Sequence, residues 1–217
     1  MLKYEAVCTL GAQIHGYISL ETVIDEWIPF NYFVIYPYIF CLLYAPLSGL
    51  LYSFYRKVSA VDVIAFYLST IGIWLSSYVI YLVFPTTAKG VMINSFDPEL
   101  LNLGMFHNLH LLYTTITHLG DFPSVHVAPL VFMGIFLYKK WRSFFWIFLP
   151  LSVVGGLGTV LLKFHTFIGL LGGVFVGIFG YYFLYKNFIL VYVTGFFENR
   201  THHNIHADLN ASDIQNL

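Results

Sequence analysis

Long runs of apolar residues dominate the chain and predict membrane-spanning helices. Runs near the roughly 20 residues that a spanning helix needs occur at 30–54, 62–84, 143–162 and 166–185, and a shorter run occupies 124–138. Their apolar residues are continuous and do not alternate with polar ones, so the pattern favours helices over the strands of a barrel. We therefore expect an all-α, polytopic transmembrane helix bundle with five to six spans.

The basic residues between these runs predict how the helices are oriented. Loops rich in Lys and Arg tend to remain cytoplasmic. One such loop contains Arg56 and Lys57, and another contains the basic residues of 139–142. Placing both loops inside puts 85–123 and His165 on the periplasmic, extracellular or lumenal side of the membrane.

The two ends of the chain differ from its apolar centre and set the domain boundaries. Residues 1–27 lack the basic start and continuous apolar core of a secretion signal, and we expect an interfacial or disordered leader. Residues 28–197 form the transmembrane domain, and 198–217 form a polar C-terminal tail. Within the domain, 186–197 is apolar but short and is expected to lie in the membrane interface. A sixth span that included it would move the tail to the other side.

The connection between the second and third runs is long enough to have a role of its own. Residues 85–123 exceed the roughly 12 to 15 residues above which a loop is usually functional or disordered. The apolar residues of 100–112 have the spacing of a short helix lying on the membrane, and 97–99 (Asp-Pro-Glu) supplies a helix start. We expect an interfacial lid helix over the outer ends of the spans.

Composition supports a membrane protein and excludes some partners. Hydrophobic residues make up 59% of the chain and charged residues 10%, whereas soluble domains carry roughly 25% charged residues. The formal net charge of -1 provides no basic surface for nucleic acid, which we exclude as a partner. Cys8 and Cys41 are too few for a disulfide framework. The tail histidines, including His202 and His203, have no supporting residues for a metal.

Three polar clusters occur at helix ends that the predicted topology places on one side of the membrane. They lie at 84–89 after the second run, at 122–126 where the third run begins, and at 163–165 between the fourth and fifth. Ser124 is suited to cap a helix N-terminus. Such a terminus attracts anions through its free N–H groups and its dipole. The clusters therefore predict an anion site at the outer face.

Two histidines and two lysines in these clusters point to phosphate chemistry. His126 and His165 supply a nucleophile and an acid, the two groups that phosphoryl transfer between oxygen atoms requires. Lys89 and Lys163 add positive charge. Ionisable groups at membrane depth are costly and usually functional, whereas a single interfacial His or Lys is more often simply hydrogen-bonded to a loop. Their occurrence together favours a phosphate-handling site.

The same clusters resemble the motifs of a known enzyme family. Residues 122–128, Phe-Pro-Ser-Val-His-Val-Ala, resemble the Pro-Ser-x-His motif of the type 2 phosphatidic acid phosphatase superfamily, in the Phe-Pro-Ser-Leu-His-Val-Ala form of its inositol phosphorylceramide synthase-like branch. Residues 158–165 resemble that branch's Ser-Thr-x-x-x-Lys-Gln-His, and 84–86 resemble its Phe-Pro-Thr. Upstream, 28–30 and 36–38 are similar to the segment that enters its first core helix.

The resemblance runs from about residue 25 to 185 and implies a lipid phosphatase or phosphotransferase that uses no metal or other cofactor. His165 would attack phosphorus and become a phosphohistidine, and His126 would protonate the leaving alkoxide. The substrate would be a lipid phosphate or phospholipid; water as acceptor gives a phosphatase and an alcohol gives a transferase. The residues expected to bind phosphate carry hydroxyl or ammonium groups: Ser124, Lys163, Lys89 and Thr159.

Three departures from the family pattern bear on activity. The family's Asp four residues after the nucleophile is Gly169 here, and such a carboxylate fixes the tautomer and stabilises the imidazolium. Thr159 stands where the phosphatase branch has an Arg. In the first motif Lys89 stands where an Arg is expected, and a Lys cannot form the two parallel hydrogen bonds that an Arg forms with phosphate. The outer-face acids available as substitutes for the missing Asp are Asp121, Asp25 and Glu26.

Gly169 leaves a second function open. A catalytically silent member of the family would bind a lipid or a membrane partner through the same pocket. Gly169→Asp is expected to raise the activity of a weakened enzyme and to leave a binding protein silent. A transporter or channel is least favoured, because the sequence shows no charged residue in mid-span and no pair of broken helices. The sequence does not predict the oligomeric state.

Overall fold

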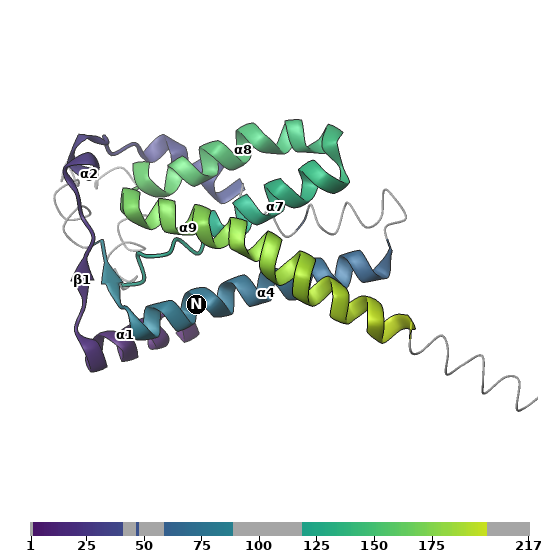
Figure 1. Ribbon diagram of the computed structural model, residues 1–217. Coiled ribbons are helices and arrows are strands. Elements are labelled where there is room, and N and C mark those ends of the chain that lie inside the picture. The colour runs from purple at the N-terminus through teal and green to yellow at the C-terminus, as the bar shows by residue number, and fades with distance from the viewer. Residues whose placement is uncertain (1, 41–46, 48–58, 89–118, 199–217) are drawn as a thin grey trace, which may run out of the picture.

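The described part of the chain is mostly helical, as the apolar runs predict (Figure 1). The computed structural model describes residues 2–40, 47, 59–88 and 119–198. The expected lid helix at 97–112, Lys89, most of the first predicted span after residue 40 and the polar tail from residue 199 lie outside these residues.

Three of the described helices are long and apolar enough to cross a membrane. This length and composition are those of an integral membrane protein. They are α4 (Ala60–Val83), α8 (Arg142–Leu161) and a continuous helix from Phe167 to Glu198. The last of these comprises α9 (Phe167–Phe179), the π-helical η3 (Gly180–Ile189) and residues 190–198.

Residues 186–197 belong to the continuous last helix. They extend the helix that begins at Phe167 and do not form a separate segment. Apolar residues lie on both sides of Lys186, and one Lys does not end a helix. At 1.5 Å per residue the 32 residues extend about 48 Å, well beyond the roughly 30 Å of the hydrocarbon core. In Figure 1 this helix accordingly projects past the others.

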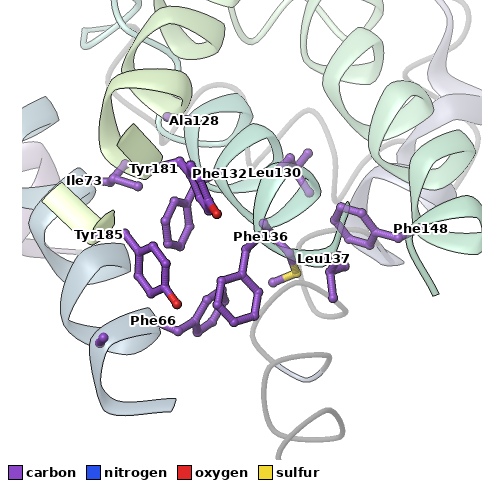
Figure 2. Packing of buried hydrophobic residues seen from close by; sticks show 12 residues of the cluster. Phe66, Ile73, Ala128, Leu130, Phe132, Phe136, Leu137, Phe148, Tyr181 and Tyr185 are labelled. Atoms are coloured by element: carbon purple, nitrogen blue, oxygen red, sulfur yellow. The ribbon is translucent and has the colours of Figure 1, made fainter. Parts of the chain in front are cut away.

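An aromatic cluster packs α7 (Val127–Lys140) against α4 and the last helix (Figure 2). Phe136 of α7 lies with its ring centroid 4.8 Å from that of Phe66 on α4 and 5.5 Å from that of Tyr185 on η3. Lipid tails are as apolar as these side chains, so tight packing and hydrogen bonding, more than exclusion from water, hold such helices together. α7 is therefore the central helix of the described bundle.

Glycines allow the last helix to approach α7 closely near its start. A Cβ at Gly173 would lie 2.8 Å from the Ser124 carbonyl oxygen, and one at Gly177 would lie 2.5 Å from that of Ala128. Both distances are shorter than real side chains permit. Small residues at helix interfaces are typical of membrane bundles. Here they hold the beginning of α7 against the beginning of α9.

The far end of α7 is fixed by a polar contact. The Asp62 carboxylate accepts from Lys140 Nζ and from the Tyr185 hydroxyl, each at 2.9 Å. This contact joins the first turn of α4, the last turn of α7 and η3. The basic residues of 139–142 gather at this end, which we call the basic end.

Residues 2–27 contain two helices, the first of which packs against the bundle. Helix α1 (Leu2–His15) packs along α4, where a Cβ at Gly11 would lie 2.5 Å from the Tyr81 carbonyl oxygen. The Cys8 side chain is buried. Much of the segment predicted to be a leader is therefore a helix that packs on α4. No residue pattern points to this contact, because Gly11 acts through its lack of a side chain.

A short pair of strands ties the N-terminal segment to the other end of the bundle. Strand β1 (Ile18–Ser19) pairs in parallel with β2 (Thr86–Thr87), and Thr87 forms an antiparallel bridge with Leu119. The Ile18 N–H also donates to the Pro85 carbonyl oxygen at 3.0 Å. The motif residues that follow α4 are thus held in place from both sides.

Candidate active site

The structure brings together the three polar clusters that the predicted topology placed on one side. Gly120 N–H donates to the Thr86 carbonyl oxygen, and Phe122 N–H donates to Thr86 Oγ1, both at 2.8 Å. The segment after Phe122 in turn contacts the loop at 162–166 through His126, which lies against His165. We call this end of the bundle, opposite the basic end, the site end.

Two histidines form the centre of the site. His126 Nδ1 lies 3.0 Å from His165 Nε2. On the other side of the His165 ring, Nδ1 lies 2.8 Å from the Asp121 backbone carbonyl oxygen. A carbonyl oxygen can only accept, so Nδ1 carries the proton, and in a neutral ring Nε2 has the free lone pair. His165 is therefore held in the tautomer that a nucleophilic Nε2 requires.

The Asp121 carboxylate lies beside His165 and next to Gly169. Its Oδ1 lies 3.5 Å from His165 Nδ1, and the side chain is fully buried. Its two carboxylate oxygens accept from the backbone N–H and the hydroxyl of Thr166 at 2.7 and 2.5 Å. A Cβ at Gly169 would lie 2.5 Å from Asp121 Oδ1. Asp121 thus fills the space in which a side chain at 169 would lie.

The other two candidate acids do not reach His165 in this way. Asp25 Oδ1 accepts from the Phe167 N–H at 2.6 Å, and its Oδ2 accepts from the backbone and hydroxyl of Thr22 at 2.8 Å. Asp25 therefore holds the N-terminus of α9, where a negative charge is favoured by the helix dipole. The Glu26 side chain, in α2 (Val23–Trp27), is exposed. Asp121 is the substitute that the geometry favours.

Ser124 caps α7, as its position in the motif predicts. Its Oγ accepts from the Val127 N–H at 3.3 Å, and its own N–H donates to the Gly169 carbonyl oxygen at 2.9 Å. The Tyr81 hydroxyl donates to the Pro123 carbonyl oxygen. These contacts hold the motif between α4 and α9 and place His126 directly before α7.

Lys163 makes a contact that the sequence did not indicate. Its Nζ is buried and donates to the backbone carbonyl oxygens of Asp25 and Ile28, each at 2.6 Å. Burial lowers the pKa of the Lys163 ammonium, and the negative charge of Asp25 opposes that shift. The backbone of Lys163 has a φ of 58°, in the left-handed region that non-glycine residues seldom adopt. The ammonium thus joins this loop to α2 and the residue after it.

Thr159 positions His165 through its backbone. Its hydroxyl donates to the Gly156 carbonyl oxygen at 2.7 Å, back along α8, and the side chain is fully buried. Its carbonyl oxygen accepts from the N–H groups of Phe164 and His165 at 2.9 and 3.1 Å. The hydroxyl that was predicted to bind phosphate is therefore engaged within its own helix. Lys89 lies outside the described residues.

Tyr38 is a site residue that sequence reasoning missed. Its ring meets the His126 ring edge to face, with centroids 5.7 Å apart, and stacks on Phe164 at 5.4 Å. The residue lies in the helical segment 35–40, which follows η1 (Tyr32–Val34). The available signal was the resemblance of 36–38 to the entry of a family core helix. Tyr38 thus forms one wall beside His126.

Comparison with known proteins gives no relative from which to transfer a function. No protein-family model, no curated protein and no solved structure matches this chain. The residues at the site end are therefore the basis for a functional assignment.

Proposed function

We propose that this protein is a membrane lipid phosphatase or phosphotransferase that acts on phosphorylated headgroups through a phosphohistidine at His165. The observation that carries the proposal is the chain of contacts from His126 to His165 to Asp121 at one end of an apolar helical bundle. The resemblance of 122–128 and 158–165 to the phosphatase motifs assigns the same two histidines. The membrane setting favours a lipid as the molecule that carries the phosphate.

The proposed site faces away from the cytoplasm. α7 begins next to His126 and ends at the basic end, where Lys140 and Arg142 lie. Basic residues favour the cytoplasmic side. The site end then opens on the periplasmic, extracellular or lumenal side.

The first step transfers the phosphoryl group to the enzyme. The lone pair on His165 Nε2 attacks phosphorus, the bond from phosphorus to the ester oxygen breaks, and the electron pair leaves with that oxygen. His126 donates a proton to the oxygen, so a free alcohol departs. Asp121 balances the positive charge that forms on the His165 ring and holds its Nδ1 proton in place through the backbone carbonyl.

The second step returns the enzyme to its starting state. The oxygen of water attacks phosphorus while His126 takes a proton from it, and the bond from nitrogen to phosphorus breaks with its electrons returning to Nε2. Inorganic phosphate is the product. An alcohol in place of water gives a phosphodiester, so the same residues serve a phosphatase or a phosphotransferase.

Substrate binding requires one histidine ring to turn. With His126 Nδ1 only 3.0 Å from His165 Nε2, no phosphorus atom fits between the two nitrogens, since reacting atoms approach to roughly 3 to 3.5 Å each. His165 is 3% exposed and is anchored at Nδ1. His126 is less buried and lies against the Tyr38 ring. His126 is therefore the ring that moves.

A catalytically silent lipid-binding protein is the alternative function. This alternative rests on the absence of a carboxylate at Gly169. The Asp121 carboxylate occupies that space and lies beside His165. The geometry therefore favours the enzyme, and measured turnover separates the two functions.

Ser124→Ala is expected to weaken phosphate handling more than it slows the chemical step. A hydroxyl that contacts a phosphoryl oxygen contributes roughly tenfold or more to kcat/KM, and its loss should appear mainly in KM. The substitution also removes the cap on Val127 N–H, at a cost of about 1 kcal/mol of folding free energy. Steady-state kinetics on a lipid phosphate and thermal unfolding measure the two effects separately.

Ser59→Ala is the matched control for that variant. Ser59 Oγ accepts from Asp62 N–H at the start of α4, at the basic end. Loss of this cap should lower the unfolding temperature to a similar extent and leave KM unchanged. Equal changes of KM in the two variants would mean that Ser124 does not bind the phosphate.

Gly169→Asp is expected to reduce activity, which reverses the sequence-based expectation of a gain. Its Cβ would lie 2.5 Å from Asp121 Oδ1 and 2.6 Å from the Asp121 carbonyl oxygen. Overpacking of this kind costs about 1 to 3 kcal/mol, and a second carboxylate adds repulsion. Gly169→Ala tests the steric part alone, and Gly195→Ala, at a position with open space, is the control. A rise in turnover for Gly169→Asp would show that Asp121 does not serve as the carboxylate.

A further inference from the structure

A groove of about 500 Å³ runs between α7, α8 and α9, inside the part of the bundle that the mechanism does not use. Its lining is almost entirely apolar. Ser152, one of its few polar residues, donates its hydroxyl to the Leu149 carbonyl oxygen at 2.9 Å and so adds little polarity to the wall. The volume lies in the range of roughly 300 to 1,000 Å³ that is typical of ligand sites.

One end of the groove lies next to residues that adjoin the candidate active site. Its lining includes Val127, which follows His126 directly, and Leu170, which follows Gly169. From there it extends along α7 to Lys139, twelve residues later and about 18 Å along the helix axis. A molecule whose polar group lies at the two histidines would therefore have its apolar part next to this end of the groove.

The far end of the groove is bordered by an aromatic ring with two cations beside it. Tyr138 lines it, and its ring has Lys139 Nζ at 5.7 Å and the Arg142 guanidinium at 5.2 Å from the centroid. Apolar chain atoms gain nothing by reaching these charges. The groove thus has a defined length as well as a defined start.

We infer that this groove holds one acyl chain of the phosphorylated lipid whose headgroup is bound by His126 and His165, an inference that rests on the proposed function. The volume of about 500 Å³ and the mostly apolar lining suit a slender apolar chain. A single extended hydrocarbon chain fits the volume, the apolar lining and the direction of the groove. Substrates with a long chain are therefore selected over short ones.

Two glycines in the lining are positions at which an added Cβ meets no close neighbour, so they are suited to substitutions that fill the groove. A Cβ at Gly156 has no neighbouring atom within 4 Å, and one at Gly134 has its nearest neighbour, Phe148 Cε1, at 3.9 Å. Leucine at either position adds bulk inside the groove, and it favours the helix more than glycine does. Gly134→Leu shortens the groove, and Gly156→Leu blocks it near the site. Gly195→Leu, also in open space on the last helix but outside the lining, is the control.

The first measurement locates the chain independently of turnover. The full-length protein in phosphatidylcholine nanodiscs is irradiated with an alkyl phosphate that carries a diazirine at the end of a long chain, and the labelled residues are mapped by mass spectrometry. Label is expected around 134–145 in wild type, His165→Ala and Gly195→Leu, and is expected to be lost in Gly134→Leu. The alkanol with the same chain and no phosphate should give weak labelling there.

The second measurement follows chain-length preference. For hexadecyl phosphate, kcat/KM should fall about tenfold or more in Gly134→Leu, while the value for hexyl phosphate stays unchanged. Gly156→Leu should lower both, and Gly195→Leu neither.

The outcomes separate the groove from the proposed function. Label in the groove without turnover of any phosphate would uphold the chain site and reject the enzyme. Turnover with label elsewhere, or with the same chain-length preference in Gly134→Leu, would reject the chain site and leave the enzyme. Equal labelling by the alkanol would mean that bulk lipid fills the groove, which also overturns the inference.

Discussion

His165→Ala is expected to abolish phosphate release and headgroup transfer, with a loss of roughly four or more orders of magnitude in kcat. The imidazole supplies the nitrogen that bonds to phosphorus, and alanine has no group that replaces it. Because the His165 ring contacts both His126 and Asp121, its loss also removes the link between acid and carboxylate. The measurement is turnover by purified protein against a panel of lipid phosphates and phospholipids, without added metal.

Folding and substrate binding must survive in this variant for the result to be read as chemistry. Thermal unfolding in the same detergent checks the first, and retention of a radiolabelled lipid phosphate checks the second. His126→Ala is the companion variant that tests the acid. An activated ester such as a nitrophenyl phosphate needs no acid to release its alcohol, so attack by His165 on this ester should survive in His126→Ala. Substantial turnover by His165→Ala would place the chemistry elsewhere in the chain.

Asp121→Asn is expected to lower kcat by roughly two orders of magnitude while KM changes little. The amide keeps the size of the side chain and leaves the backbone carbonyl on His165 Nδ1, so the tautomer is preserved. What is lost is the negative charge 3.5 Å from the ring, which stabilises the cationic phosphohistidine as it forms. The effect should therefore be smaller than that of a variant that also loses the tautomer. Pre-steady-state formation of the phosphoenzyme measures it directly.

Asp25→Asn is a matched control for this variant. Both carboxylates are buried at the start of α9, where Asp121 accepts from Thr166 and Asp25 accepts from Phe167. Both variants should lose about 1 kcal/mol of helix-capping free energy. The rate of phosphoenzyme formation should fall in Asp121→Asn alone. An equal fall of this rate in both variants would mean that Asp121 acts only as a helix cap.

The helical elements follow from local patterns, and the sequence predicts them well. α4 and α8 match the apolar runs at 62–84 and 143–162. The last helix was placed correctly at its start but ended too early, because the pattern was divided at Lys186. Tertiary packing on α7 and α4, through the buried Tyr181 and Tyr185, continues the helix there.

The site residues that belong to a motif could be predicted from the sequence. Contacts between segments that are distant in the sequence could not. His126, His165 and Ser124 come from the motifs. The role of Asp121 depends on a contact across 44 positions of sequence, and no local spacing encodes such a contact. From the sequence, Gly169 indicated a missing carboxylate, because a glycine does not show which other residue occupies the space of its absent side chain.

Lys163 and Thr159 show a different limit. The sequence supplies the residue type, and the backbone decides where the polar group points. The left-handed φ of Lys163 accompanies an ammonium hydrogen-bonded to residues 25 and 28. The Thr159 hydroxyl lies within reach of a carbonyl in the preceding helical turn. In both cases a local hydrogen bond competes with the predicted phosphate contact.

The most direct test of the proposed chemistry is to trap the covalent intermediate. His126→Ala is mixed with a phosphorus-labelled nitrophenyl phosphate, quenched rapidly under alkaline conditions that preserve phosphohistidine, and digested for mass spectrometry. Attack by His165 needs no acid with this leaving group, whereas release of phosphate needs His126 to activate water. Labelled phosphate is therefore expected to accumulate on His165, in close to stoichiometric amount, and to be absent from His165→Ala. Turnover of the same ester by wild type with no label on His165 in any variant would contradict a phosphohistidine mechanism.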